Sequence, residues 1–167
     1  MESVILMGPP GAGKTTVGKH LAKLCKRNFL DTDRIIEERE GRSIGEIFMD
    51  GGEATFRAIE RKVVLEVLET EDSIIALGGG SVLDPEVQAK LSEHRSVVFL
   101  DVSISNAAPR VGFNKERPLL MGNPRQQWLS LMEKRRGTYE QLANLTVSTD
   151  NRKAHEVAEE IAKRVKL

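Results

Sequence analysis

Residues 8–15 of the chain read GPPGAGKT, which matches the pattern G-x-x-x-x-G-K-[ST] at every defined position. An apolar run at Val4–Met7 comes just before it, and an amphipathic helical pattern follows, with apolar positions at Val17, Leu21, Leu24 and Cys25. Between a strand and a helix, glycines let successive backbone N–H groups surround an anion, and the helix N-terminus adds partial positive charge. The stretch therefore predicts a phosphate-binding loop for a nucleoside triphosphate.

Each residue type in this loop has a specific use in binding the triphosphate. The ammonium group of Lys14 can reach the β- and γ-phosphates, and the hydroxyl of Thr15 can ligate Mg²⁺. The residues expected to bind ATP here are Gly11, Ala12, Gly13, Lys14, Thr15 and Thr16. A glycine-rich turn that binds nothing is the competing interpretation, and the register of glycine, lysine and threonine argues against it.

Length and charge narrow the class of protein. The 167 residues predict one domain over 1–167, and 25 basic residues balance 25 acidic ones. A net charge of zero argues against a broad nucleic-acid surface, and no apolar run approaches the length of a membrane span. No leader segment is recognisable before the first strand. We expect a cytoplasmic protein with small-molecule partners, no nucleic acid and no membrane. We also expect a monomer, with which the balanced charge and the few aromatic residues are compatible.

Short apolar strands alternate with helical patterns along the chain. The expected strands are 4–7, 29–30, 73–77, 97–100 and 145–147. Helix starts are indicated by the capping-box spacing at Ser43–Glu46 and by a cap residue before proline at Asp84 and Asn123. This alternation predicts an α/β fold of three layers, with a five-stranded parallel sheet between helices. The segment at about 112–123 has weak periodicity and is expected to be a mobile lid.

Asp31 and Asp101 are both candidates for holding the metal ion. Asp31 and Asp33 follow the second expected strand, and alternate residues of a strand point the same way. One carboxylate can hold Mg²⁺ through water, and the other can orient or deprotonate a hydroxyl. Helix capping by Asp33 is the alternative for that residue. Asp101 also ends an apolar strand, and spacing alone does not decide between Asp31 and Asp101.

Further candidates lie beyond the third strand and on two helices. Three consecutive glycines, 78–80, allow a backbone to approach a ligand closely and to offer N–H donors. Arg57 and Glu60 share a helix face, which taken alone indicates an i, i+3 surface pair. Arg135 lies late in a long helix, and a single exposed arginine is more often structural than functional.

Taken together, the chain resembles the shikimate kinases, a family of small P-loop kinases related to the nucleoside monophosphate kinases. The resemblance covers essentially the whole chain, in family order and spacing. The stretches that carry it are GPPGAGKTTVG (8–18), LDTDRIIEE (30–38), GRSIGEIF (41–48), GEATFRAIE (52–60), LGGGSVL (77–83), RVGFNKERPLL (110–120) and KRRGTY (134–139).

The resemblance implies a role for each candidate residue. Asp33, Lys14 and Arg117 would be catalytic, Arg117 stabilising charge on the transferred phosphoryl group. Mg²⁺ would be held by Thr15 directly and by Asp31 through water, which favours Asp31 over Asp101. ATP would also contact Arg110, Arg117, Pro118 and Arg152. The substrate would contact Asp33, Arg57, Glu60, Gly78, Gly79, Gly80 and Arg135, within and beyond a substrate-binding region at about 33–60.

The implied reaction is transfer of phosphate from ATP to the 3-hydroxyl of shikimate, giving shikimate 3-phosphate and ADP on the route to chorismate and the aromatic amino acids. Gly137-Thr138 departs from the usual pattern before Tyr139, which leaves Arg136 as the fallback for Arg135. A gluconate-type kinase on the same scaffold is the main alternative. A nucleoside monophosphate kinase and a non-enzymatic nucleotide switch are weaker alternatives.

Overall fold

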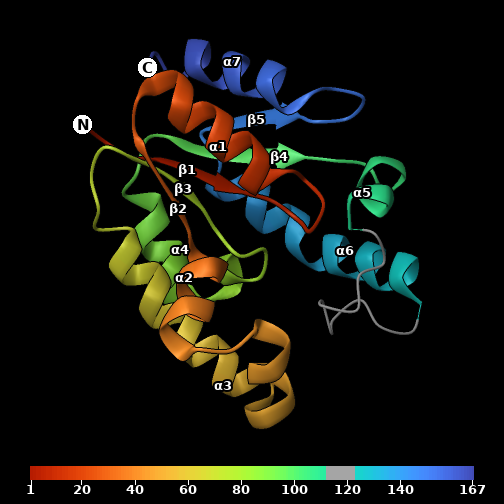
Figure 1. The fold of residues 1–167 in the computed structure, drawn as a ribbon. Helices are drawn as coiled ribbons and strands as arrows, with labels where there is room; N and C mark the ends of the chain where they lie inside the picture. The colour runs from red at the N-terminus through yellow and green to blue at the C-terminus, as the bar shows by residue number, and fades with distance from the viewer. Residues whose placement is uncertain (112–122) are drawn as a thin grey trace.

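A computed structural model describes residues 1–111 and 123–167, and its centre is a five-stranded parallel sheet (Figure 1). The strand order is β2-β3-β1-β4-β5. The strands are β1 (Val4–Met7), β2 (Asn28–Asp31), β3 (Ser73–Ala76), β4 (Val97–Asp101) and β5 (Leu145–Ser148). This confirms the predicted parallel sheet, and each expected strand is present with its ends within two residues.

Helices cover both faces of the sheet. Helices α1 and α7 pack against each other on one face, and α3, α4 and α6 lie on the other (Figure 1). The helical elements are α1 (Lys14–Cys25), α2 (Thr32–Glu40), α3 (Ile44–Val67), the 3₁₀ turn η1 (Ser81–Leu83), α4 (Pro85–Ser92), α5 (Ile104–Val111), α6 (Pro124–Leu142) and α7 (Ala154–Arg164). The predicted three-layer α/β fold is therefore confirmed.

The central strands are apolar because both of their faces are covered. Every residue of β1 and β3 is buried, and so are the first four residues of β4. This is the continuous apolar run that a parallel sheet between helices requires. All of the strands end at one edge of the sheet, where parallel α/β proteins bind their ligands.

Helix starts follow the capping signals in the sequence. The Ser43 hydroxyl accepts a hydrogen bond from Glu46 N, and the Asp84 carboxylate accepts two, from Glu86 N and Val87 N. Helix α3 is interrupted at Gly52, whose φ of 76° and ψ of −179° are not helical. The break separates a short first helix from the longer helix that carries Arg57.

The cap of α2 differs from the one considered in the sequence. Asp31, rather than Asp33, is the N-cap residue, and its side chain accepts from Asp33 N and Arg34 N. Strand β2 runs on to Asp31, whose extended backbone (φ −114°, ψ 116°) suits a cap position. Asp33 thereby lies in the first turn of α2, and its carboxylate is not used as the cap.

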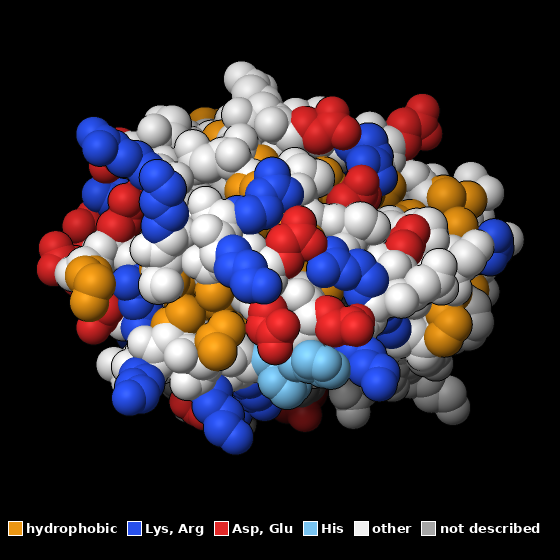
Figure 2. Space-filling view, turned by 90° about the horizontal axis from the view of Figure 1, so that it is seen from above, with side chains coloured by type: hydrophobic (Ala, Val, Ile, Leu, Met, Phe, Trp, Pro, Cys, Tyr) orange, Lys and Arg blue, Asp and Glu red, His pale blue; other side chains and the backbone are white. Residues whose placement is uncertain are grey.

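The face formed by α1 and α7 mixes charges of both signs, with Lys and Arg side chains next to Asp and Glu (Figure 2). Over 1–111 and 123–167, no helix combines the length and the apolar character needed to cross a bilayer.

Candidate active site

The phosphate-binding loop connects β1 to α1 through three glycines with positive φ. These are Gly8 (155°), Gly11 (83°) and Gly13 (89°), and Gly13 is the residue before the first turn of α1. A β-carbon at Gly11 would lie 2.8 Å from the Ala107 carbonyl oxygen. Gly11 is therefore required both by its backbone conformation and by the close approach of α5. Ala12 lies in the same turn, and its N–H donates to the Pro9 carbonyl at 3.1 Å.

The polar side chains of this loop lie at the start of α1. Lys14 Nζ donates to the carbonyl oxygens of Gly8 at 2.6 Å and Pro9 at 3.1 Å. The Thr15 hydroxyl donates to Asp31 Oδ2 at 2.7 Å, and Thr16 is exposed beside it. A hydroxyl and a carboxylate thus lie side by side at the helix N-terminus, as oxygen ligands of a hard cation would.

Asp101 is in a different environment from Asp31. Its two carboxylate oxygens accept from the guanidinium of Arg136, at 3.0 and 3.2 Å. This two-pronged pair uses both oxygens of Asp101 at the end of β4. Asp31, by contrast, contacts the hydroxyl of Thr15 in the phosphate-binding loop.

The three consecutive glycines after β3 provide room for side chains. None of them has a positive φ, so backbone freedom is not the reason for glycine here. A β-carbon on Gly78 would lie 2.6 Å from Asp33 Oδ1 and 2.9 Å from Glu60 Oε2. A β-carbon on Gly80 would lie 2.5 Å from both terminal nitrogens of Arg57. The triple glycine therefore lets two carboxylates and a guanidinium converge on one stretch of backbone.

Arg57 and Glu60 form an ion pair in this cluster, at 2.7 Å between Nη1 and Oε1. The Glu60 side chain is only 4% exposed. Burial raises the pKa of Glu60 to about 7, with Asp33 adding to the rise and the positive charges of Arg57 and Arg135 opposing it. Glu60 thus holds Arg57 in place, and its pKa lies close to neutral pH.

Arg135 and Arg136 occupy opposite environments on α6. Arg135 is 4% exposed, and its Nε has no hydrogen-bond partner among the described residues. Its Nη1 would lie 3.2 Å from a β-carbon on Gly79. The Arg136 side chain is 42% exposed and is paired with Asp101. The structure therefore brings Arg135, and not Arg136, to the triple glycine.

The phosphate-binding loop and the arginine-lined glycines are in contact. A β-carbon on Gly79 would lie 3.2 Å from the Gly8 carbonyl oxygen, the same distance as from Arg135 Nη1. A site for phosphate groups and a site for an anionic molecule thus meet at Gly79. This arrangement suits transfer of a group between two bound molecules.

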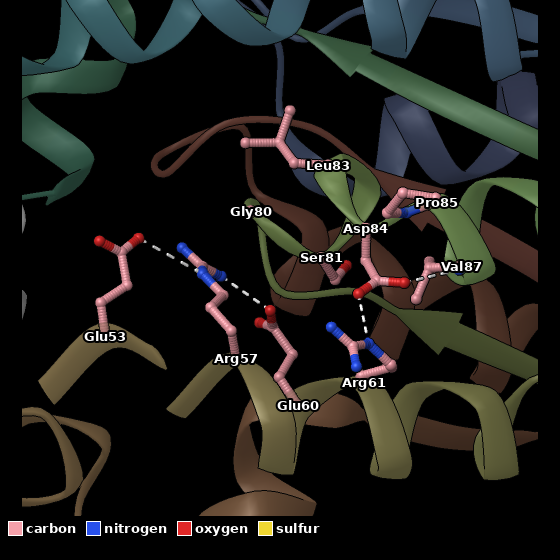
Figure 3. Close-up of a pocket in the computed structure, with 10 residues that line it drawn as sticks. All are labelled: Glu53, Arg57, Glu60, Arg61, Gly80, Ser81, Leu83, Asp84, Pro85 and Val87. Atoms are coloured by element: carbon pink, nitrogen blue, oxygen red, sulfur yellow. Dashed lines mark hydrogen bonds and ion pairs between the residues drawn. The ribbon is translucent and has the colours of Figure 1, made fainter. Parts of the chain in front are cut away.

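A cavity of about 300 Å³ opens beside this cluster, between α3 and the segment from Gly80 to Val87. Arg57 lies between Glu53 and Glu60 at one side of it, with Gly80 close by, and Arg61 is paired with Asp84 at another side (Figure 3). The volume is at the lower end of the range for small-molecule sites. Arg135 does not line this cavity, which therefore extends the acceptor region on the Arg57 side.

Two of the arginines expected to contact ATP are held by segments at the end of β5, and one of them also contacts the phosphate-binding loop. Arg110, on α5, donates to the Gly11 carbonyl at 3.2 Å and to the Thr149 carbonyl at 2.8 Å. Arg152 donates to the Ser148 carbonyl at 3.0 Å and pairs with Glu160 at 2.7 Å. The expected lid at about 112–123, with Arg117 and Pro118, lies outside the described residues apart from Asn123, which caps α6.

Three side chains of the site were not singled out from the sequence. The Tyr139 hydroxyl donates to the Gly79 carbonyl at 2.6 Å, and the Thr32 hydroxyl accepts from Gly78 N at 3.0 Å. Trp128 Nε1 donates to the Pro10 carbonyl at 2.8 Å. Tyr139 follows Arg135 by four residues, so helical spacing could have placed it on the same face. The other two contacts join distant segments and leave no local signal.

Comparison with known proteins identifies the family of this chain. The family model described as "Shikimate kinase" matches residues 10–166. A shikimate kinase of Thermobifida fusca is 48% identical over 159 residues, which are 95% of this chain and 92% of that protein. A solved structure named as shikimate kinase from Acinetobacter baumannii in complex with shikimate has a TM-score of 0.96 and 35% identity, covering 99% of this chain and 93% of that one.

A more distant likeness shows the fold alone. A gluconokinase of Sinorhizobium meliloti has a TM-score of 0.56 and 22% identity, covering 99% of this chain and 91% of that one. The family model and the close relatives, by contrast, span almost the entire chain. The chain belongs to the shikimate kinase family.

Proposed function

We propose that this protein transfers the γ-phosphoryl group of ATP to the 3-hydroxyl of shikimate, giving shikimate 3-phosphate and ADP in the synthesis of chorismate and the aromatic amino acids. The observation that carries the proposal is the contact at Gly79. There the phosphate-binding loop, through Gly8, meets a cluster that contains Arg135, Arg57 and two carboxylates. A kinase for a small carboxylic acid with hydroxyl groups needs a phosphate-binding loop and an acid-binding cluster next to each other.

The acceptor half recognises an anion. Arg57 and Arg135 present guanidinium groups, which match a carboxylate in shape and charge. Arg135 is buried with an unpartnered Nε, so a bound carboxylate would supply a hydrogen bond that the described protein does not. Glu60 orients Arg57, and the N–H groups of the triple glycine serve as further donors. Arg135 is therefore our choice over Arg136 for the carboxylate of shikimate.

The transfer step depends mainly on position and charge. The 3-hydroxyl oxygen forms a bond to the γ-phosphorus while the bond from that phosphorus to the β-phosphate oxygen breaks. Asp33 aims the hydroxyl and accepts its proton, and Lys14 neutralises charge on the phosphoryl oxygens. A loose transition state demands little of a base, so Asp33 acts chiefly by orientation.

Mg²⁺ is proposed as the cofactor of this step, with Thr15 as its direct ligand and Asp31 as its support through water. The donor set fits, because the Thr15 hydroxyl and the Asp31 carboxylate are 2.7 Å apart at the phosphate-binding loop. The ion neutralises charge on the triphosphate. We expect Asp31→Asn to raise the Mg²⁺ concentration needed for half-maximal rate, and Asp101→Asn to leave it unchanged. The opposite pattern would assign the metal to Asp101.

We further propose that residues 1–167 work as one catalytic unit, as a monomer in the cytoplasm, with ATP and shikimate as small-molecule partners. Size-exclusion chromatography with light scattering tests the oligomeric state. A mass near twice the 18.6 kDa of the chain contradicts the monomer.

The experiment that tests the function is ADP release with a panel of acceptors. Shikimate, gluconate and AMP are offered with ATP and Mg²⁺, and kcat/KM is compared. We expect shikimate to exceed the other two by at least about 10³-fold, because an acceptor whose hydroxyl groups and shape do not match the site leaves buried polar groups unpaired. Gluconate at or above shikimate would replace this proposal with the gluconate kinase alternative, and stimulation by AMP would favour a nucleoside monophosphate kinase.

A further inference from the structure

Tyr139 is a buried residue of α6 that contacts the triple glycine from inside the protein. Its side chain has no exposure to solvent, and its ring stacks on Phe99 of β4 with 5.0 Å between centroids. Its hydroxyl donates a 2.6 Å hydrogen bond to the carbonyl oxygen of Gly79. Burial raises the pKa of Tyr139 to about 12 against the opposing charge and hydrogen bonding of Arg135, so the hydroxyl keeps its proton and remains a donor at physiological pH.

This hydrogen bond determines the direction of a neighbouring donor. The carbonyl of Gly79 and the N–H of Gly80 belong to the same peptide unit, and the chain has no cis peptide bond among its described residues. In a planar trans peptide these two groups point in opposite directions. A hydroxyl that holds the Gly79 carbonyl therefore directs the Gly80 N–H away from Tyr139. Gly80 itself lines the cavity beside Arg57 (Figure 3).

The other polar groups of the triple glycine have partners within the protein. Gly78 N donates to Thr32 Oγ1, and its carbonyl accepts from Ser81 N and from the Ser81 hydroxyl. The Gly80 carbonyl accepts from Leu83 N at 3.2 Å. Within 1–111 and 123–167, none of these hydrogen bonds uses the N–H of Gly79 or Gly80. These are the two donors that the loop can offer to a bound molecule.

We propose that Tyr139 is a positioning residue for the acceptor, which holds the Gly79–Gly80 peptide so that its N–H faces the acceptor oxygens. The inference rests on the proposed function, because it concerns how shikimate is bound. Glycine on both sides of a peptide lowers the cost of rotating it. The carbonyl therefore needs an anchor, and Tyr139 supplies it one helical turn beyond Arg135.

The variant that tests this role is Tyr139→Phe, which removes the hydroxyl and keeps the ring on Phe99. We expect the KM for shikimate to rise about tenfold, because the Gly79 carbonyl and Arg135 both lose the Tyr139 hydroxyl, while the KM for ATP stays within about twofold. The matched control is Val157→Ala, a buried residue of α7 that lies outside the site. It should lower the melting temperature without changing either KM.

The outcomes separate this role from the proposed function. Wild-type turnover of shikimate with an unchanged KM in Tyr139→Phe refutes the positioning role and leaves the kinase assignment intact. An equal rise of the KM in Val157→Ala refutes it too, because the effect would then follow stability alone. A wild-type protein that forms no product from shikimate refutes both proposals.

A second measurement needs no substitution. Tyr139 is the single tyrosine of the chain, so growth on 3-fluorotyrosine labels this position and retains the hydroxyl. We expect its ¹⁹F resonance to shift when shikimate is added, and to move much less with ADP alone. A ¹⁹F chemical shift that does not change at saturating shikimate contradicts the proposal, even if Tyr139→Phe cannot be purified.

Discussion

The indole nitrogen of Trp128 donates a 2.8 Å hydrogen bond to the carbonyl of Pro10, so α6 is attached to the phosphate-binding loop. Eleven residues later the same helix reaches Gly79 through Tyr139, at 2.6 Å. Helix α6 therefore contacts both halves of the site, the nucleotide loop near its N-terminus and the acceptor glycines near its C-terminus.

Because Trp128 is the single tryptophan of the chain, its fluorescence should report nucleotide binding. We expect the emission to change on addition of ADP and Mg²⁺.

Trp128→Phe, which loses the hydrogen bond to Pro10, should raise the KM for ATP about fivefold, the equivalent of about 1 kcal/mol. The KM for shikimate should stay within about twofold in the same variant. Emission that is insensitive to saturating ADP counts against the contact as a reporter of the loop.

Lys14→Met should remove the cation that we propose to face the triphosphate. We expect kcat to fall by at least about 10³-fold, because a charged donor aimed at the transferred group contributes several kcal/mol to the transition state. Lys19→Met is the matched control, since Lys19 is exposed on the same helix. Activity of Lys14→Met within a few-fold of the wild type would remove the phosphate-binding loop from the mechanism.

Arg135→Ala and Arg136→Ala form a direct comparison of neighbouring residues. Loss of Arg135 should raise the KM for shikimate by about 100-fold, since a buried charge-assisted contact is removed, while the KM for ATP changes little. Arg136→Ala should alter the KM for shikimate by less than about threefold, because Arg136 pairs with Asp101. If the two variants exchange these effects, Arg136 rather than Arg135 binds the carboxylate of shikimate.

Glu60 makes stability depend on pH in a direction that can be measured. Its pKa rises from 4.5 to about 7 on folding, so between these values the folded protein binds more protons than the unfolded chain. Stability from this group is therefore greatest at low pH and falls as pH rises toward 7. Relative to Glu60→Gln, the wild type should lose about 2 kcal/mol of unfolding free energy between pH 5 and pH 8.

The measurement is denaturant unfolding of both proteins at each pH, because titration of the groups that do not interact with Glu60 cancels in the difference. Arg57, Arg135 and Asp33 are the charged groups that act on Glu60, and all three are present in both proteins. A difference that is constant with pH would show that Glu60 keeps an ordinary pKa in the fold.

Much of the fold could be predicted because its signals lie within short stretches of the sequence. Strand β1 is a continuous apolar run, and the glycines of the adjoining loop have the positive φ that the motif requires. The start of α4 at Asp84-Pro85 follows from capping chemistry alone. The capping alternative for Asp33 was wrong, because the end of β2 could not be located to the residue and Asp31 takes that position.

The site was predictable only in part, for a physical reason. The triple glycine indicated close approach, yet the sequence does not say that the room is filled by Asp33, Glu60 and Arg57. The bond from Trp128 to Pro10 joins residues 118 positions apart, and that from Tyr139 to Gly79 joins residues 60 apart. Such contacts depend on the sheet order, because α6, which leads into β5, reaches the loops that follow β1 and β3.

The position of the phosphate on the product tests the central claim most directly. The protein is incubated with ATP, Mg²⁺ and shikimate, and the product is studied by ¹H–³¹P correlation NMR. We predict one phosphomonoester whose phosphorus couples to the proton on ring carbon 3, in an amount equal to the ADP formed. Coupling to the proton of a different ring carbon, or ADP formed without any phosphorylated shikimate, would contradict the account.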